Sequence, residues 1–282
     1  MAIVGACALV LAGLVVLASP RHRAFYFQGA TAPGGALPPG LGLPSLPGAP
    51  GGFPVGAPAR SSAAIAMRRQ VLTADGEGLK VPVADDAPFR LPVTGVPSGW
   101  ELREFAGHAD ITLVRGERGL AVQLRSERAS FALYRDVVVG LDEFPVLTWS
   151  WKVARLPARG DVREAGHDDQ AAQVYVVFPR WPSPRTNSDV IGYVWDTTAP
   201  VGTTVPSPRA PNVRIIVVAS GSVGLGAWQH YQRNVDEDYR ALFRRRPPRV
   251  GTVALMIDTN DTGTIAEATI GQLFFSRAPQ RK

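Results

Sequence analysis

Short apolar segments alternate with turn-forming residues from Phe89 almost to the end of the chain. Valine, isoleucine, threonine and aromatic residues are enriched in these segments, as pleated, half-buried strands favour. Glycine, proline, asparagine and serine stand between them, where turns need them. Many short strands without interleaved helices indicate an all-β fold, an antiparallel β-sandwich or jelly roll. The predicted strands are 110–115, 119–126, 130–139, 146–154, 171–178, 190–196, 213–220, 250–258 and 264–276.

One short helix is predicted near the C-terminal third of the chain, directly after Asn234. Asn234 suits the N-cap position, and Glu237 follows three residues later, close to a capping box. Acidic residues crowd the first turn and arginines crowd the last, which complements the helix dipole. Pro247 and Pro248 end the helix, because proline cannot continue it.

The first 85 residues do not share the strand pattern. Residues 1–20 are an apolar signal or anchor segment, uncharged from residue 2 to residue 18. Residues 21–85 are predicted to be a disordered linker rich in proline, glycine and alanine, since 17 of the 32 residues from 29 to 60 are glycine or proline. We therefore expect one β-sandwich domain over residues 86–277 and a disordered tail at 278–282.

The leader and the linker together suggest export. The body after Cys7 contains no cysteine, which excludes a disulfide, a thiolate metal site and a cysteine nucleophile there. We expect a periplasmic or secreted protein, or one anchored to the membrane by its N-terminal segment. Arg21 and Arg23 follow the apolar run, however. Applied to these two arginines, the positive-inside rule would place the body in the cytoplasm.

The formal net charge of +6 comes almost wholly from arginine. The arginines are spread along the chain apart from a cluster at 240–249, which a solvated helix end explains. No helix-turn-helix, zinc-knuckle or aromatic RNA-binding signature accompanies them. We therefore expect no nucleic-acid partner.

Several distinctive motifs follow one another along the chain. They are Trp149-Ser-Trp151, Asp168-Asp169 before Val-Tyr-Val-Val-Phe178, Tyr193-Val-Trp195, Ser220-Gly221, Trp228, Arg233-Asn234-Val235, Asp238-Tyr239 and Met256-Ile-Asp258. The series resembles the exported bacterial proteins of domain-of-unknown-function family 3047, over about residues 86–277. The resemblance implies export and a β-sandwich, and it brings no known activity. Gln173 stands where the family's arginine is expected, and Arg244 replaces a glycine expected after Phe243.

Two aromatic pairs are candidate binding residues. Trp149 and Trp151 share one face of a predicted strand, because strand side chains alternate with period two. Tyr193 and Trp195 share a face in the same way. The functional interpretation is an aromatic platform that stacks sugar rings, and the alternative is a large core face.

Two acidic pairs are the other candidates. Asp168 and Asp169 precede one strand, while Asp258 and Asp261 lie around the end of another. Loops at one end of a sandwich come from distant strands, so we expect the pairs to converge. Converging carboxylates repel each other unless a cation or an arginine compensates. Arg233 as the counter-ion would make a structural latch, calcium would make a metal site, and two carboxyl groups facing a groove would permit catalysis.

No Gly-x-Ser-x-Gly motif of serine hydrolases, no His-Glu-x-x-His motif and no phosphate loop is present, and the Asp258–Gly263 segment lacks the glutamate that a calcium loop requires. We therefore expect a non-catalytic module of the cell envelope that binds a carbohydrate or related polymer, without a cofactor unless calcium is bound. The alternatives are a glycoside hydrolase or lyase that uses the acidic cluster, and a purely structural envelope protein. The predicted binding residues are Trp149, Trp151, Asp168, Asp169, Tyr193, Trp195, Arg233, Asp258 and Asp261.

Overall fold

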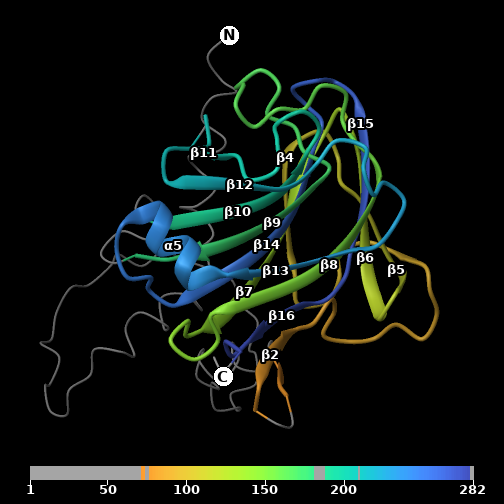
Figure 1. The fold of residues 1–282 in the computed structure, drawn as a ribbon. Helices are drawn as coiled ribbons and strands as arrows, with labels where there is room; N and C mark the ends of the chain where they lie inside the picture. Colours follow the sequence, from red (N-terminus) through yellow and green to blue (C-terminus); the bar gives the residue numbers. More distant parts are fainter. Residues whose placement is uncertain (1–70, 74–75, 181–187, 209, 280–282) are drawn as a thin grey trace, which may run out of the picture.

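The computed structural model describes residues 71–73, 76–180, 188–208 and 210–279. Two β-sheets pack face to face, and one short helix lies at their side (Figure 1). This arrangement confirms the predicted all-β sandwich with a single helix, within the described residues. The apolar leader at 1–20, most of the linker and the end of the tail lie outside those residues. Inside them, no helix has the length and apolar character needed to span a membrane.

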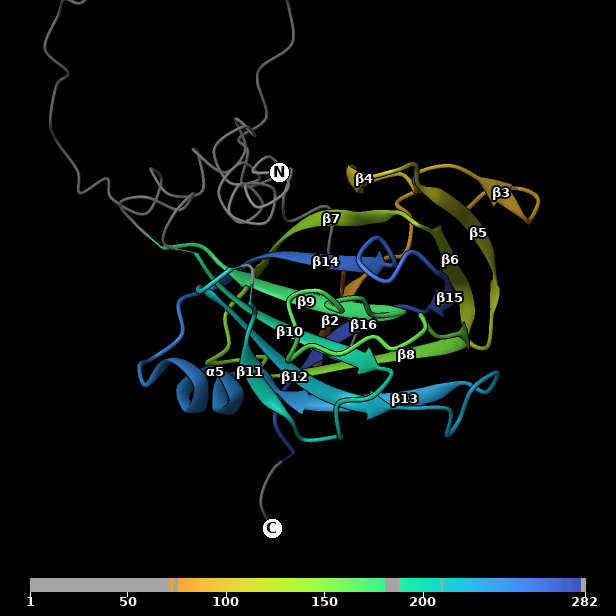
Figure 2. The same cartoon turned by 90° about the horizontal axis from the view of Figure 1, so that it is seen from above.

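The first sheet, which we call sheet A, contains nine strands and curls strongly (Figure 2). The strand order is β1-β2-β16-β8-β15-β6-β5-β3, and β13 pairs with β8 beside this path. All of its pairings are antiparallel. The bounds in that order are Val71–Leu72, Gly78–Val81, Leu273–Ser276, Val146–Arg155, Ile265–Ile270, Gly119–Glu127, Asp110–Gly116 and Val93–Thr94, with β13 at Gln229–Asn234.

The second sheet, sheet B, contains seven strands in the order β11-β12-β10-β9-β14-β7-β4. It is mixed, because β10 and β12 run parallel while the other pairs are antiparallel. The bounds in that order are Thr204–Pro206, Val213–Ser220, Asp189–Asp196, Ala172–Phe178, Val250–Asp258, Ser130–Val139 and Glu101–Ala106.

Strand β8 is the centre of sheet A. One of its edges pairs with β13, and the other pairs first with β16 and then with β15. The strand predicted over 264–276 is therefore two strands, separated by Gly271 and Gln272. Across the break the Gly271 N–H still donates to the Ser150 carbonyl at 2.9 Å, so the two pieces stay aligned along β8.

Strand β2 begins the sheet earlier than the sequence pattern indicated. Its residues Gly78–Val81 lie inside the segment expected to be a linker, yet they pair with β16. Leu79 and Val81 are buried while Lys80 between them is exposed. This four-residue alternation is too short to stand out beside the proline-rich stretch that precedes it.

The core between the sheets is dominated by aromatic rings. Trp149 and Trp151 of β8 contact each other edge to face, with ring centroids 5.5 Å apart. Tyr193 of β10 lies 5.2 Å from Trp149, and Trp195 lies 6.4 Å from Trp151. Tyr231 of β13 stacks on Trp149 at 5.5 Å. The cluster therefore joins the two sheets directly, through β8 and β13 on one side and β10 on the other.

The helix α5, Val235–Phe243, forms where the capping residues predicted it. The Asn234 side chain accepts a hydrogen bond from the Glu237 N–H at 3.2 Å. The helix ends at Arg244, which has a left-handed backbone with φ 56°. A glycine, which the family resemblance implies at this position, would adopt that conformation without steric cost.

We predict that Trp151→Ala lowers the free energy of unfolding by ~3–5 kcal/mol, because it removes one of the two largest fully buried side chains between the sheets. Urea denaturation followed by circular dichroism measures the loss. Val223→Ala is the control, since Val223 is 87% exposed and should change stability by less than about 0.5 kcal/mol. A loss for Trp151→Ala as small as the control's would contradict the packing role.

Candidate functional site

The aromatic side chains predicted to form a platform are not accessible. Trp149, Trp151, Tyr193 and Trp195 are each at most 3% exposed. Their shared faces point into the space between the sheets, so the alternation that aligned them placed them in the core. The platform interpretation of these four residues is wrong, and packing accounts for them.

The two acidic pairs do meet, at one end of sheet B. The Asp169 carboxylate accepts hydrogen bonds from the backbone N–H of Asp261 at 3.1 Å and of Thr262 at 2.6 Å. The Asp258 N–H donates to the Gln170 carbonyl at 3.1 Å. The segment before β9 and the turn after β14 are therefore held together by hydrogen bonds.

Burial and the neighbouring carboxylates act on the acidic side chains of this cluster. Burial raises the pKa of Asp258 well above its ordinary value, and the neighbouring Asp169 carboxylate raises it further. Both effects favour the protonated form of the Asp258 carboxyl beside Asp169. Asp169 itself is fully buried and stabilised by the two backbone donors.

Arg233 binds a different acid, which corrects the predicted latch. Its guanidinium donates to Asp238 in the first turn of α5, through Nε at 2.9 Å and through Nη2. The Tyr193 hydroxyl also donates to Asp238, at 2.8 Å. Arg233 directly precedes the helix cap, so the carboxylates of the first helical turn are nearer than those of the loops.

The described residues contain no group of three or more His, Cys, Asp or Glu side chains placed to hold a metal ion. The Asp258–Gly263 segment is a turn, in which Gly263 has φ 64° and the Asn260 amide donates to Asp261 at 2.9 Å. The calcium alternative therefore has no ligand cluster in this part of the chain.

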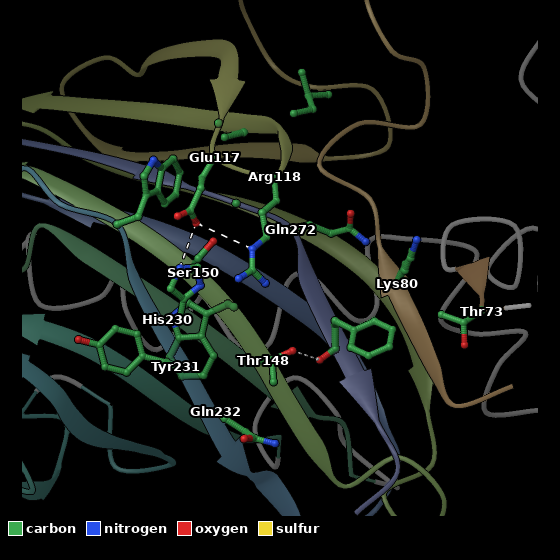
Figure 3. Close-up of a pocket in the computed structure, with 17 residues that line it drawn as sticks. Thr73, Lys80, Glu117, Arg118, Thr148, Ser150, His230, Tyr231, Gln232 and Gln272 are labelled. Atoms are coloured by element: carbon green, nitrogen blue, oxygen red, sulfur yellow. Dashed lines mark hydrogen bonds and ion pairs between the residues drawn. The ribbon is translucent and has the colours of Figure 1, made fainter. Parts of the chain in front are cut away.

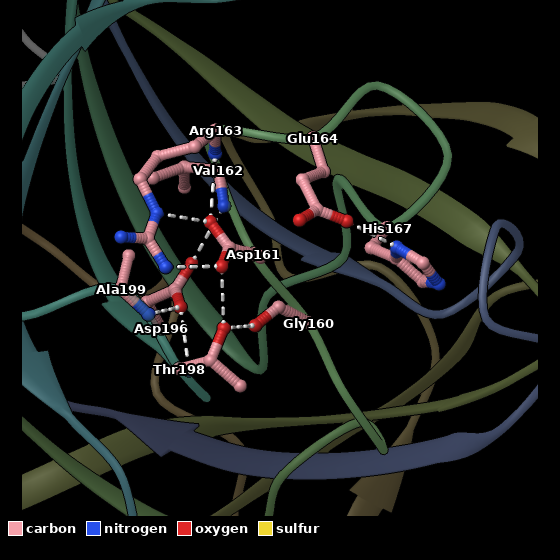
Figure 4. Close-up of polar contacts among 9 residues, drawn as sticks. All are labelled: Gly160, Asp161, Val162, Arg163, Glu164, His167, Asp196, Thr198 and Ala199. Atoms are coloured by element: carbon pink, nitrogen blue, oxygen red, sulfur yellow. Dashed lines mark hydrogen bonds and ion pairs between the residues drawn. The ribbon is translucent and has the colours of Figure 1, made fainter.

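A second polar network fixes the 156–170 loop on sheet B (Figure 4). Asp161 accepts two hydrogen bonds from Arg163 and one from Thr198, at 2.6–2.8 Å, and the Arg163 contact lowers its pKa. Asp196 accepts the N–H groups of Val162 and Ala199 at 2.9 and 2.6 Å, while burial raises its pKa. Both carboxylates are bonded to groups of the fold, so we interpret the network as structural.

A pocket of about 590 Å³ lies on the outer face of sheet A, away from the acidic cluster (Figure 3). Register partners on neighbouring strands build its floor. Gln232 of β13 pairs with Thr148 of β8, Thr148 pairs with Phe274 of β16, and Phe274 pairs with Lys80 of β2. Directly paired residues point to the same side of a sheet, so these four side chains form one row.

A second, shorter row runs beside the first. His230 of β13 pairs with Ser150 of β8, and Gly271 lies beyond Ser150. A Cβ at Gly271 would come within 2.7 Å of the Ser150 hydroxyl, so a side chain there would displace its neighbour. The missing side chain leaves the hollow at the break between β15 and β16.

Trp228 forms one wall of the pocket and is only partly buried. Its six-membered ring lies over two glycines, 3.4 Å from a Cβ built at Gly116 and 3.9 Å from one at Gly271. The Lys152 ammonium lies 5.9 Å from the ring centroid. Glycine at these two positions lets an indole rest against the sheet surface while part of the ring faces solvent.

The β5–β6 turn supplies the charged wall. Glu117 lies 3.0 Å from His230 Nε2 and 4.0 Å from Arg118 Nε (Figure 3). Gln272 adds a primary amide from the β15–β16 connection. The pocket thus combines the aromatic rings of Trp228 and Phe274 with hydroxyl, amide, ammonium, guanidinium and carboxylate groups.

Sequence reasoning missed this pocket, although a signal was present. Thr148, Ser150 and Lys152 alternate with the tryptophans of the same strand, so they marked the opposite and solvent-facing side. Trp228 stands alone after a glycine-rich run from 221 to 226, where no strand period assigns it to a core.

Residues 98–274 match the family described as protein of unknown function, DUF3047. This chain belongs to that family. The expected resemblance is therefore confirmed. The match covers sheet B, the acidic cluster and sheet A apart from β1–β3 and the last residues of β16, and it leaves Thr73 and Lys80 of the pocket lining outside. No curated protein matches the DUF3047 chain by sequence.

Several solved structures share part of the fold. The xyloglucanase domain of NopAA from Sinorhizobium fredii, in complex with cellobiose, is 10% identical, with a TM-score of 0.38 over 66% of this chain and 96% of its own. Endoglucanase cel12A from Rhodothermus marinus is 10% identical, with a TM-score of 0.37 over 67% and 100%. A family 12 xyloglucanase from Bacillus licheniformis is 9% identical, with a TM-score of 0.36 over 74% and 96%. Similarity at this level carries no argument about activity.

We predict that Asp258→Asn changes how stability depends on pH. The unfolded chain loses the Asp258 proton near pH 4, whereas the folded protein holds it to higher pH, so wild-type stability falls as pH rises through the folded pKa. The asparagine cannot ionise and can still donate to Asp169. The variant should therefore gain on the wild type between pH 4 and pH 8, by more than the roughly 0.5 kcal/mol of a surface change.

Melting temperatures across that pH range measure the effect. Asp110→Asn is the matched control, because Asp110 is exposed and should give a difference from wild type that does not change with pH. Parallel profiles for Asp258→Asn and wild type would show that Asp258 is not protonated in the fold.

Proposed function

We propose that this DUF3047 protein is a non-catalytic module that binds a polysaccharide in the pocket on the outer face of sheet A. The observation that carries the proposal is Trp228, a partly exposed indole beside a hollow of about 590 Å³ that hydrogen-bonding side chains line. The stacking role that the sequence suggested for Trp149 and Trp151, which are buried, is thus proposed for Trp228 instead.

The lining matches the chemistry of a pyranose. A sugar ring has an apolar C–H face, which packs on an aromatic side chain, and a rim of hydroxyl groups, which need donors and acceptors. Gln232 and Gln272 offer planar amides with both functions, and Thr148 and Ser150 offer hydroxyls. Most of these groups stand on paired strands, whose backbone is already ordered before binding, which lowers the entropy cost of binding.

The pocket does not offer the groups for glycoside hydrolysis. Most glycosidases use two carboxyl groups, about 5–5.5 Å apart when retaining and about 6.5–9.5 Å apart when inverting. Glu117 is the single carboxylate among the described lining residues, and His230 contacts it. The buried Asp169 and Asp258 share a hydrogen bond at another site and leave no room between them for a sugar. We therefore place the hydrolase alternative second.

The cell envelope is the proposed location of this binding. The apolar leader and the proline-rich linker support export, and a linker of that composition would hold the domain away from an attachment point. A glycan-binding domain outside the cytoplasm would meet envelope polysaccharides there.

We predict that Trp228→Ala weakens polysaccharide binding about tenfold or more, because it removes the stacking surface, which corresponds to roughly 1.4 kcal/mol. Affinity electrophoresis against a panel of neutral and acidic polysaccharides identifies a ligand, and calorimetry then gives the dissociation constant. Trp228→Phe should retain most of the affinity, since it keeps an aromatic face. The melting temperature of each variant checks that the fold is intact.

Val223→Ala is the matched control for a change in the same connecting segment, because Val223 is exposed and does not line the pocket. Equal affinities for wild type and Trp228→Ala would remove the pocket from the proposal. A failure of every polysaccharide to retard the wild-type protein would remove the function itself.

We also predict that the protein leaves the cytoplasm when it is expressed with its own first 85 residues. A fusion of alkaline phosphatase after Lys282 should be active, because that enzyme matures only where disulfides form. Deletion of residues 2–18 should abolish the activity by removing the apolar leader. Equal phosphatase activity with and without the leader, or none with either, contradicts export.

A further inference from the structure

We infer that the pocket binds an acidic polysaccharide, one whose sugars carry carboxylates, and that Lys80 and Arg118 recognise those groups. The inference rests on the proposed function and names the class of glycan that the same site takes. It follows from the charge, the spacing and the type of the cations around the pocket.

The cations of the pocket exceed its anions. Lys80 and Arg118 line it, and Lys152 lies against the Trp228 ring that forms its wall. Glu117, the acid among the described lining residues, already has His230 at 3.0 Å and Arg118 at 4.0 Å. Lys80, Arg118 and Lys152 are three cations against one carboxylate, so the pocket keeps a net positive charge that can act on a ligand.

Lys80 is held where a ligand would lie and has no counter-ion among the described residues. It pairs with Phe274 in the β2–β16 register, so its side chain extends from the outer face at the end of the pocket row. The buried Leu79 and Val81 on either side fix that strand against the core. The position of Lys80 is thus set by packing, and its ammonium remains exposed to solvent.

The basic residues at this pocket differ in type from those in the rest of the chain. Only three of the 30 basic residues are lysine, and two of those three, Lys80 and Lys152, lie at the pocket or on its wall. Arginine presents a rigid planar fork, whereas lysine presents a compact charge with three donors on a flexible stem. The chain uses arginine almost everywhere else and lysine at this pocket. Flexible lysine donors suit a ligand whose hydroxyl and carboxylate groups vary in position.

The cations are spread across the pocket and do not converge on one point. Lys80 belongs to β2, Arg118 to the β5–β6 turn and Lys152 to β8, three separate elements of sheet A. A phosphate monoester is best bound by donors that converge on one group. A polymer with one carboxylate on each sugar places its charges at intervals, which suits cations on separate elements with an aromatic ring beside them.

The experiment compares two probes that differ in charge alone: oligogalacturonates of four to six sugars and the same oligomers with every carboxyl reduced to the alcohol. Calorimetry at about 50 mM and about 200 mM salt should give at least tenfold tighter binding of the acidic oligomer at low salt. The difference should shrink at high salt, where the screening length falls below about 10 Å. Lys80→Gln and Arg118→Gln should each weaken acidic binding about three- to tenfold and neutral binding less than twofold.

Arg246→Gln is the charge-matched control, since it removes one exposed cation at the end of α5 outside the pocket lining and should leave both affinities unchanged. Equal affinity for the two oligomers, with Trp228→Ala abolishing both, would overturn the inference and leave the proposed function standing. Absence of binding to either oligomer and to the polysaccharide panel would overturn both. Tighter binding of sulfated than of carboxylated oligomers would overturn the assignment of carboxylate.

Discussion

The burial of Trp149 and Trp151 between the two sheets determines the rest of the structure. Neighbouring side chains on a strand point to opposite faces, so turning the tryptophans inward turns Thr148, Ser150 and Lys152 outward. The rings contact Tyr193 and Trp195 of the other sheet, which fixes how the sheets pack. The floor of the pocket is therefore the reverse side of the aromatic core, and a shift of β8 by one residue would exchange the two.

Local signals in the sequence were sufficient for most elements and insufficient for the site. The strand 130–139 and the helix after Asn234 were predicted correctly, because strand alternation and helix caps involve only neighbours in the chain. Strand β13 was missed because every residue of it except Tyr231 is strongly polar, so no apolar alternation appears along it. Whether Trp149 or Trp228 is exposed depends on which sheet covers each ring, and that is a property of the folded chain.

The acidic cluster also shows that local sequence signals do not determine electrostatic contacts in the folded chain. Topology predicted that the pairs at 168–169 and at 258–261 would meet, and hydrogen bonds at Asp169 confirm the contact. What stabilises them could not be read from residue types, because backbone N–H donors and the burial that raises the pKa of Asp258 leave no mark in the sequence. Arg233 was the arginine proposed as the counter-ion, yet its guanidinium donates to Asp238 in the first turn of the helix that follows it.

The pairing of β2 with β16 sets the order in which the pocket can be assembled. Lys80 belongs to an early strand and Phe274 to the last, and the row across the floor is complete only when both are in place. A chain synthesised from its N-terminus therefore has no finished pocket until its final strand has been made and has docked. A chain that ended before residue 273 would lack Phe274, which stands between Thr148 and Lys80 in that row, so a C-terminal truncation would open the hollow on sheet A even with every earlier strand present.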